Sequence, residues 1–335
     1  MGMEFSRPVR WLLLLAVLLL AVFPFVGADY YTELVVRIMI FGIFAMSLDL
    51  LIGFTGLVSF GHAAFFGLAG YVLAIVTPES SGVSLFWSLP LSILASGLAA
   101  AIIGWFSVRT TGIYFIMITL AFAQMVFYYF QEAVQWGGSD GMFLFFRPTV
   151  TIGNTVILDL EQNRTFYYFV LGSLVASLLL VKRLLGSPFG RVIMGIKANE
   201  SRTRAIGYAT FYYKWVSFII AGMLAGLAGY LEVTHTGTIS PGYLAWHESG
   251  IVIMVVVLGG LGTLYGPVIG AFVFVVLQDT LQDYTSHWLL IMGILVILIA
   301  LFLPKGVTGL LDQILYRQGI QNTNNEDHGH QDHRT

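Results

Sequence analysis

Long apolar stretches recur along almost the whole chain, and they constrain its fold more than any other feature. A helix needs about 20 apolar residues to cross the hydrocarbon core of a bilayer. The apolar stretches cover residues 11–28, 34–54, 57–77, 85–106, 112–130, 166–182, 215–233, 249–283 and 287–303. Charged residues make up only 10% of the 335 residues, against about 25% in an average soluble domain. We therefore predict an all-α polytopic membrane protein without a sizeable soluble domain.

The stretch 249–283 decides how many times the chain crosses the membrane, because it is too long for one straight span and too short for two full ones. Its middle holds Gly259, Gly260, Gly262, Gly266 and Pro267. A short helix over about 249–260, a glycine-rich turn and a second helix over about 265–283 give ten crossings, whereas one continuous helix gives nine. We favour ten, because Lys305 and Arg317 follow the last stretch and because broken helices are typical of substrate paths.

Positive charge indicates the orientation of the chain, because cytoplasmic loops retain Lys and Arg. Seven of the sixteen basic residues fall between 182 and 214, namely Lys182, Arg183, Arg191, Lys197, Arg202, Arg204 and Lys214. We therefore predict that segment 183–213 is a cytoplasmic loop. An even number of crossings precedes it, which places Arg7 and Arg10 inside and the polar loop 131–165 outside. The first stretch is longer than the apolar part of a signal peptide, so we expect a retained span.

Several classes of function are excluded by what the sequence lacks. A formal net charge of −2 provides no basic field for nucleic acid. The absence of cysteine excludes disulfides, thiolate metal sites and cysteine nucleophiles. No lysine follows a glycine as a phosphate-binding loop requires, so the chain cannot be its own ATPase. The histidines and carboxylates form no catalytic or nucleotide-binding pattern, so we expect neither an enzyme nor a cofactor or metal bound by this chain.

The basic loop 183–213 predicts two short helices joined by a turn. Pro188 suits the first position of the first helix, and Asn199 can cap the second by accepting from the backbone N–H groups of its first turn. Gly207 can end that second helix. A short exposed helix with charge on one side and Ile or Ala on the other suits docking into a groove of a soluble partner. The alternative is an ordinary solvated loop beside the lipid headgroups.

Four motifs, in this order, resemble the permease family of branched-chain amino-acid ABC importers, and in particular the second of its two paired permeases. They are the segment 51–65, which begins Leu-Ile-Gly-Phe-Thr-Gly, the outer-loop motif Gly-Gly-Ser-Asp-Gly at 137–141, the segment 188–229, and the glycine-rich segment 257–270. The ending Pro-Lys-Gly-Val-Thr-Gly at 304–309 also matches. The resemblance covers about residues 30–312 and implies a fold like that of the ten-span cobalamin-type permeases.

The resemblance implies three regions and a set of partners. Residues 1–30 are the N-terminal cytoplasmic segment and first span, residues 31–312 the permease domain with its coupling loop 183–213, and residues 313–335 a polar, disordered cytoplasmic tail. The implied function is to form the path for leucine, isoleucine and valine across the cytoplasmic membrane of a bacterium or archaeon. The implied partners are a homologous second permease, two ATPase subunits that bind the ATP, and an extracytoplasmic substrate-binding protein.

The resemblance also implies that the helix from Asn199 and Glu200 to Gly207 is the counterpart of the family's coupling motif, which sits in a cleft of the ATPase subunit. The residues expected to couple to the ATPase are Arg191, Asn199, Glu200, Arg204, Ala205 and Gly207. Arg204 stands where the family usually has a small residue. We predict that this helix transmits the work of the ATPase and is not needed for the folding of the membrane bundle.

Two glycine-rich interruptions of the apolar stretches predict where the substrate passes, because unwound backbone inside a membrane is tolerated where it lines a cavity. The candidate path residues are Ser59, Gly61, His62, Gly259, Gly260, Gly262 and Gly266. For His62 the alternative is a packing histidine with satisfied hydrogen bonds. Asp49, near the inner end of the second span, either takes part in transport or hydrogen-bonds a neighbouring helix.

Two other functions and one other site stay open at this stage. Importers of urea and short-chain amides use closely related permeases, so the substrate class has an alternative. A stand-alone secondary transporter or channel is a further one, although it needs no docking loop and the paired intramembrane carboxylates of an ion relay are scarce. His328, His330 and His333 have a spacing that can bind a divalent metal, but a solvated tail is the favoured interpretation.

Overall fold

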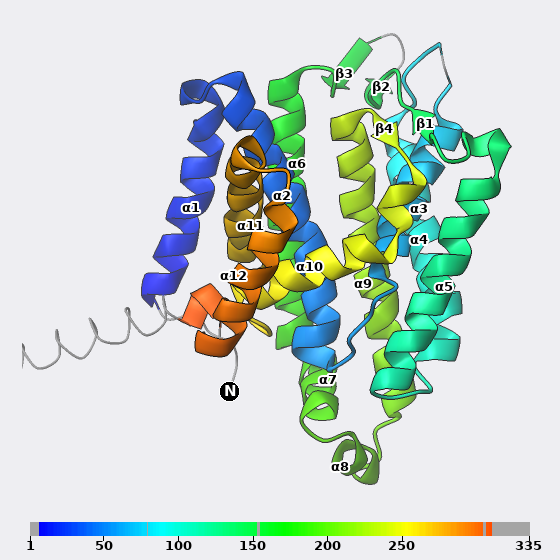
Figure 1. Cartoon of the computed structure of the whole chain (residues 1–335), viewed down its shortest axis with the longest axis vertical. Coiled ribbons are helices and arrows are strands. Elements are labelled where there is room, and N and C mark those ends of the chain that lie inside the picture. The colour runs from blue at the N-terminus through cyan, green and yellow to red at the C-terminus, as the bar shows by residue number, and fades with distance from the viewer. Residues whose placement is uncertain (1–6, 79, 153–154, 304–305, 310–335) are drawn as a thin grey trace, which may run out of the picture.

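Within residues 7–78, 80–152, 155–303 and 306–309, which the computed structural model describes, ten apolar helices form a bundle (Figure 1). They are α1 (Arg7–Val26), α2 (Asp29–Asp49), α3 (His62–Val76), α4 (Leu85–Ser107), α5 (Ile113–Glu132), α6 (Asn163–Gly186), α9 (Thr210–Thr236), α10 (Trp246–Gly259), α11 (Gly266–Tyr284) and α12 (Trp288–Phe302). Each helix falls on a predicted apolar stretch. The prediction that 249–283 is broken in two is confirmed, because the turn 260–265 separates α10 from α11.

Length and composition make five of the described helical segments able to cross a membrane unaided. These are Asp29–Thr55, Leu85–Ser107, Ile113–Glu132, Asn163–Gly186 and Thr210–Thr236. Four shorter apolar helical segments accompany them, namely Leu15–Phe25, His62–Val76, Trp246–Gly259 and Trp288–Ile299. The chain is therefore a mostly helical, multi-pass membrane protein, as the sequence predicts.

The two ends of the bundle differ, and they separate the two predicted loops. Two short helices, α7 (Pro188–Ala198) and α8 (Glu200–Ala205), extend beyond one end, here named the α8 end (Figure 1). The opposite end, here named the strand end, carries most of the segment 131–165. Helix α1 begins and α12 finishes on the side nearer α8 (Figure 1). The loops predicted to lie on opposite sides of the membrane thus lie at opposite ends of the molecule.

The strand end corrects one part of the all-α prediction. Two small antiparallel pairs form there, β1 (Met142–Phe143) with β4 (Thr238–Ile239), and β2 (Thr149–Ile152) with β3 (Thr155–Asp159). A 3-10 turn, η2 (Val134–Trp136), also lies in the segment 131–165, and a second one, η3 (Pro241–Leu244), packs against α3 and α5. The strand residues are rich in Thr, Val and Ile, which fit a pleated strand better than a helix. The polar composition of 131–165 predicts only a loop, so the strands are a correction to that prediction.

Helices α2 and α9 form the centre of the bundle. The most apolar part of Asp29–Thr55 is 83% buried and that of α9 is 72% buried, against 33% or less for α4, α5 and α6. Helix α9 packs against α2, α3 and α4, and small residues make the close approach possible. A Cβ added at Gly222 would collide with Ala100, one at Gly226 with Ser96, and one at Gly229 with the backbone of α3. Gly222 and Gly226 are four residues apart, a spacing that is typical of tightly packed membrane helices.

Replacing Gly226 with leucine should therefore destabilise the bundle. The added Cβ would lie 2.6 Å from both side-chain atoms of Ser96, and overpacking of this kind typically costs about 1–3 kcal/mol. We expect a lower melting temperature in detergent and a lower yield of folded protein. Gly172→Leu on α6 is the matched control, because nothing lies within 4 Å of a Cβ built there. Equal melting temperatures for the two variants would contradict the close packing of α4 on α9.

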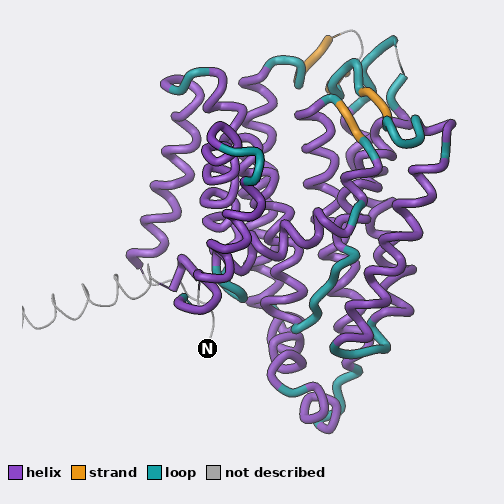
Figure 2. The backbone as a smooth tube through the Cα atoms, in the orientation of Figure 1, coloured by secondary structure: helices purple, strands orange, loops and turns teal. Residues whose placement is uncertain are grey.

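Both predicted interruptions are present as breaks in helical structure. Helix α2 continues as one π-helical segment, η1 (Leu50–Thr55), and Gly56 then turns the chain with a φ of +81°. The segment 56–61 is extended and runs beside the helices before α3 begins (Figure 2). Helix α3 therefore starts at His62, five residues after the start of the apolar stretch at 57. π-Helical turns are uncommon and occur frequently at functional sites.

Candidate functional site

Helix α8 owes its position to local sequence signals, and these confirm the predicted helix pair. Pro188 occupies the start of α7, where its missing N–H is no loss. The Asn199 Oδ1 accepts a hydrogen bond of 2.9 Å from the Arg202 backbone N–H and so caps α8. Gly207 has a φ of +102°, a backbone conformation that is strained for residues with a side chain, and it ends the helical turn. The two helices are thus separated by a single capping residue.

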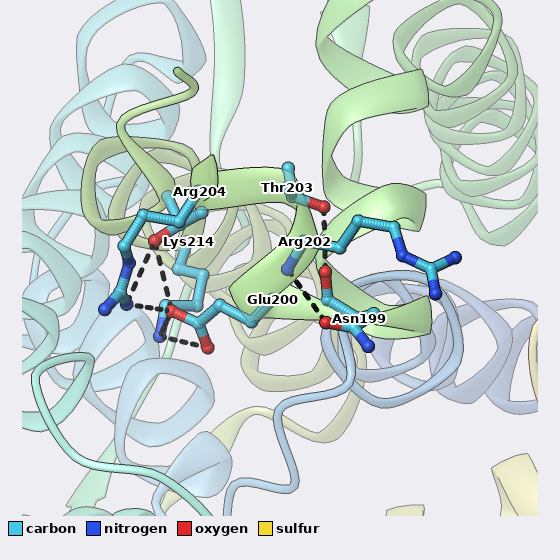
Figure 3. Close-up of polar contacts among 7 residues, drawn as sticks. Asn199, Glu200, Arg202, Thr203, Arg204 and Lys214 are labelled. Atoms are coloured by element: carbon cyan, nitrogen blue, oxygen red, sulfur yellow. Dashed lines mark hydrogen bonds and ion pairs between the residues drawn. The ribbon is translucent and has the colours of Figure 1, made fainter. Parts of the chain in front are cut away.

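Glu200 is the centre of a polar cluster that holds α8 against the bundle (Figure 3). Its Oε1 lies 2.9 Å from the Arg204 Nη2 and 3.0 Å from the Lys214 Nζ, and its Oε2 lies 3.1 Å from the same Lys214 Nζ. The Thr210 hydroxyl donates to Oε1 at 3.1 Å. Lys214 and Thr210 belong to α9, so Glu200 joins α8 to the central helix of the bundle. We name Glu200, Arg204, Thr210 and Lys214 the Glu200 cluster.

The three charges of the Glu200 cluster differ in their exposure, and this decides what each contributes. The side chain of Lys214 is 5% exposed and that of Glu200 is 24% exposed, whereas that of Arg204 is 67% exposed. An exposed pair four residues apart on a helix contributes only about 0.3–0.5 kcal/mol. A hydrogen bond to a charged group contributes about 1.5–3 kcal/mol. The Glu200–Lys214 contact is therefore the main link between α8 and α9.

The surroundings of Glu200 keep its carboxylate ionised. Partial burial raises the pKa of Glu200. The hydrogen bond and charge of Lys214, the hydrogen bond from the Thr210 hydroxyl and the charge of Arg204 lower the pKa by more than burial raises it. The pKa of Glu200 therefore lies below the ordinary glutamate value. The ion pair is consequently complete at neutral pH.

The outer surface of α8 is free for a partner. Arg202 points away from Glu200 (Figure 3), and Ser201, Ala205 and Ile206 are also exposed. Beside the helix lies a cleft of about 400 Å³, bounded by Glu200 and Arg204 on one side and by Arg109 on the other. The Arg109 guanidinium lies 4.8 Å from the ring centre of Trp105. Arg109 follows α4 and belongs to no sequence motif, so its place beside Glu200 could not be predicted.

The structure brings five of the six predicted coupling residues onto one short element. Asn199, Glu200, Arg204, Ala205 and Gly207 lie in α8 or at its two ends. Arg191 is exposed on α7, away from this set. The role of these residues toward an ATPase stays a prediction. Lys214 lies within the motif 188–229, but the sequence does not indicate that it pairs with Glu200.

A second polar cluster joins α7 to both interruptions. The Lys197 Nζ of α7 donates a short hydrogen bond to the Gly53 carbonyl of η1. The Gly262 N–H donates to the Asp49 Oδ1 at 2.9 Å, although 213 residues separate the two. A Cβ added at Gly262 would lie 2.9 Å from the Gly53 carbonyl oxygen. Asp49, Gly53, Lys197 and Gly262, here named the polar junction, therefore hold the two interruptions together at the base of α7.

The candidate path residues fall into two groups, and of these residues only Gly262 belongs to the polar junction. The first group, Ser59, Gly61 and His62, lies beside α10, where the Ala63 N–H donates to the Ser249 hydroxyl at 2.9 Å. The second group is tightly packed. A Cβ added at Gly259 would collide with the Gly266 carbonyl, and one added at Gly266 would collide with the Gly260 carbonyl. Six of the seven are buried and Gly262 is half-buried. They line no open channel in this conformation, so their role in a path stays a prediction that requires a conformational change.

His62 has features of both interpretations that the sequence left open. Its Nε2 lies 2.7 Å from the Ser47 hydroxyl, and its ring stacks on Phe44 with ring centres 5.7 Å apart. Its Nδ1 is buried and has no hydrogen-bond partner among the described residues. The ring of His62 is therefore packed and hydrogen-bonded through Nε2, while Nδ1 has no partner among the described residues.

The tail is not part of the described structure. Residues 313–335, with the predicted histidines His328, His330 and His333, lie outside the described residues. Among the residues that are described, no group of three or more His, Cys, Asp or Glu side chains could hold a metal ion.

The chain is a multi-pass helical bundle with two interruptions of its helices and a pair of short helices beyond one end. This architecture is that of a membrane transport permease. Residues 30–300 match the family model described as "Branched-chain amino acid transport system / permease component", and the chain belongs to this family.

Two relatives extend over most of the chain. The high-affinity branched-chain amino acid transport system permease protein LivM of Salmonella typhimurium (strain LT2) is 28% identical over 316 residues, which cover 88% of this chain and 74% of the relative. LivM of Escherichia coli (strain K12) is 27% identical over the same coverage. The ribose import permease protein RbsC of E. coli K12 is 30% identical over 123 residues, or 35% of this chain and 38% of the relative. No solved structure gives a significant match.

Proposed function

We propose that this chain is the permease subunit of an ATP-driven importer and carries branched-chain amino acids. The observation that carries the proposal is the match of residues 30–300 to the family, together with α8 braced outside the bundle by Glu200 and Lys214. The relatives that extend over 88% of the chain are named as branched-chain amino acid permeases. The absence of a phosphate-binding loop requires that separate ATPase subunits supply the energy.

We propose a topology with ten crossings, in which the two ends of the bundle lie on opposite sides of the membrane. The α8 end, which carries the basic segment 182–214, faces the cytoplasm, and the strand end faces outward. Helix α1 then begins inside. The crossings are the ten apolar helices, of which α10, with 14 residues, is the shortest. The membrane is the cytoplasmic membrane of a bacterium or archaeon.

The proposed complex contains a homologous second permease, two ATPase subunits and an extracytoplasmic binding protein. Helix α8 and the cleft beside it form the contact with one ATPase subunit, and Arg191 on α7 adds to that contact. The strand end receives the loaded binding protein. This arrangement suits a chain in which seven of the sixteen basic residues lie in segment 182–214.

Reconstitution of the complete importer in lipid vesicles tests the proposal. Vesicles with all subunits, ATP inside and leucine-loaded binding protein outside should accumulate leucine against a gradient. Vesicles with this chain alone should not accumulate it and should show no turnover of ATP. Accumulation by the chain alone would identify a secondary transporter instead. Uptake of urea or acetamide but not of leucine, isoleucine or valine by the complete importer would assign the other substrate class.

A further inference from the structure

A groove on the surface of the bundle, which the coupling and path assignments leave unused, lies between α6 and α9. Its volume is about 560 Å³, and its lining is apolar apart from Arg183 and Ser187. The apolar walls come from α4, α6 and α9, with Ile93, Leu180 and Leu227 among them. Helix α9 packs on α4, whereas α6 packs on α2 and α7, so the groove lies where α6 and α9 do not pack closely on each other.

The groove has the length and position of one leaflet of a bilayer. Arg183 lies in the last turn of α6, which ends at the α8 end, and Leu227 lies just past the middle of α9 (Thr210–Thr236). The lining follows α9 from Ile220 to Leu227, a rise of about 10 Å at 1.5 Å per residue. Half of the hydrocarbon core of a bilayer is about 15 Å thick. The groove therefore runs from one interface toward the middle of the membrane.

Positive charge is concentrated at the α8 end of this groove. Arg183 is exposed, and in the described part of the chain the ion pairs are those that Glu200 makes with Arg204 and Lys214. Arg183 thus has no carboxylate partner among the described residues. Ser187 caps α7 by accepting from the Gly190 N–H at 3.3 Å, so the positive end of the α7 dipole lies at the same end of the groove. Both features favour an anion there.

We propose that this groove binds an anionic phospholipid of the cytoplasmic leaflet. The Arg183 guanidinium receives the phosphate group, whose oxygens suit its paired N–H donors, and one acyl chain lies along the apolar walls. Basic pockets between membrane helices on the cytoplasmic side are typical sites for anionic head groups. The assignment to the cytoplasmic leaflet rests on the proposed topology, in which the α8 end faces the cytoplasm.

The size and the charge of the groove favour a lipid over a helix of the second permease. A helix with its side chains is about 10–12 Å wide, so about 10 Å of its length would occupy roughly 800 Å³ or more. The groove offers only about 560 Å³. An apolar helix would also bring no anion to Arg183 and the start of α7. A phospholipid combines a narrow acyl chain with a phosphate group and so matches both the apolar walls and the charged end.

Lipid binding by the full-length chain, purified in detergent and measured by native mass spectrometry, tests the inference. The probes are dioleoylphosphatidylglycerol, which is anionic, and dioleoylphosphatidylcholine, which has the same acyl chains and no net charge. The wild type should bind phosphatidylglycerol more tightly. Arg183→Gln should lower the affinity for phosphatidylglycerol about fivefold, as expected for one basic residue near a membrane surface, and leave that for phosphatidylcholine unchanged. Leu180→Trp narrows the groove and should weaken the binding of both lipids.

Helix α6 offers a matched control for each variant. Leu179 is the neighbour of Leu180 and is exposed, but it does not line the groove, so Leu179→Trp should bind both lipids as the wild type does. Arg164 is exposed in the first turn of α6, so Arg164→Gln removes a positive charge at the opposite end of the helix and should leave the preference for phosphatidylglycerol unchanged.

The remaining outcomes separate the lipid from other occupants and this inference from the proposed function. Wild-type affinity for phosphatidylglycerol in both Arg183→Gln and Leu180→Trp would overturn the inference. If these variants also recovered less of the second permease, the groove would instead be a contact with that subunit. Displacement of the lipid by an equal concentration of inorganic phosphate would overturn the role of the acyl chain. The expected lipid binding by a chain whose complete importer carries no leucine would support the site and count against the proposed function alone.

Discussion

Lys214→Met should uncouple the importer while leaving its membrane bundle folded. Methionine has a similar length and is apolar, so it fills the space that the nearly buried Lys214 side chain occupies. Glu200 then keeps only its exposed partner Arg204 and the Thr210 hydroxyl. Loss of a charged hydrogen bond costs about 2 kcal/mol, which corresponds to a shift of roughly 30-fold in the equilibrium that holds α8 against α9. We expect leucine uptake to fall by about the same factor.

Two measurements separate loss of coupling from loss of folding. The melting temperature of the purified permease should change little, whereas the amount of permease recovered through a tagged ATPase subunit should fall sharply. Arg164→Met is the control, because Arg164 is exposed in the first turn of α6, at the strand end, and takes no part in the proposed contact with the ATPase. Normal recovery and normal uptake in Lys214→Met would show that the brace between α8 and α9 does not transmit the work of the ATPase.

The same brace gives a pH dependence whose sign is fixed. The pKa of Glu200 in the folded protein is lower than its ordinary value of 4.5. The ion pair therefore contributes fully above the ordinary value, and its contribution is lost as the pH falls through the lowered pKa. Binding of the ATPase subunit should stay constant from neutral pH down to about 5 and weaken only at more acidic pH. Lys214→Met should remove part of that acid sensitivity.

The helices could be predicted from the sequence because their signal is local. Ten apolar helices coincide with the predicted stretches, and the break between α10 and α11 follows from the glycines at 259–266. The positions of Pro188 and Asn199 at the starts of α7 and α8 depend on interactions within a few residues, so the sequence carries the information directly. The strands at 149–159 were missed because a short hairpin inside a polar loop gives only a weak alternation.

The contacts that assemble the site could not be predicted, because they join residues distant in sequence. The partner of Asp49 is a backbone N–H at Gly262, and a backbone donor has no sequence signature of its own. Lys197 and Gly53 meet in the same way across 144 residues. Glu232 lies near the end of an apolar stretch, where a charged residue is typical of the membrane surface. Only the packing of α2, α9 and α10 shows that Glu232 is buried.

Asp49→Ala should weaken both the stability and the transport activity of the chain. The carboxylate accepts the Gly262 N–H at 2.9 Å inside the bundle, and Asp49 is 1% exposed. Alanine leaves this half-buried donor without its acceptor, which costs about 1 kcal/mol or more. The loop 260–265 would then be free to separate from η1. We expect a lower melting temperature in detergent and a loss of leucine uptake in reconstituted vesicles.

Asp49→Asn separates the hydrogen bond from the charge at the polar junction. Asparagine keeps an oxygen that can accept from Gly262, so the melting temperature should recover most of what Asp49→Ala loses. Asparagine has no ionisable carboxyl group, so the electrostatic interaction of Asp49 with Lys197 is lost. The Lys197 Nζ holds the Gly53 carbonyl at the base of α7. If the polar junction carries movement of α7 to the two interruptions, uptake should remain impaired in Asp49→Asn although the fold is restored. Uptake that recovers in step with the melting temperature would show that the junction only supports the fold, because a neutral acceptor would then be sufficient.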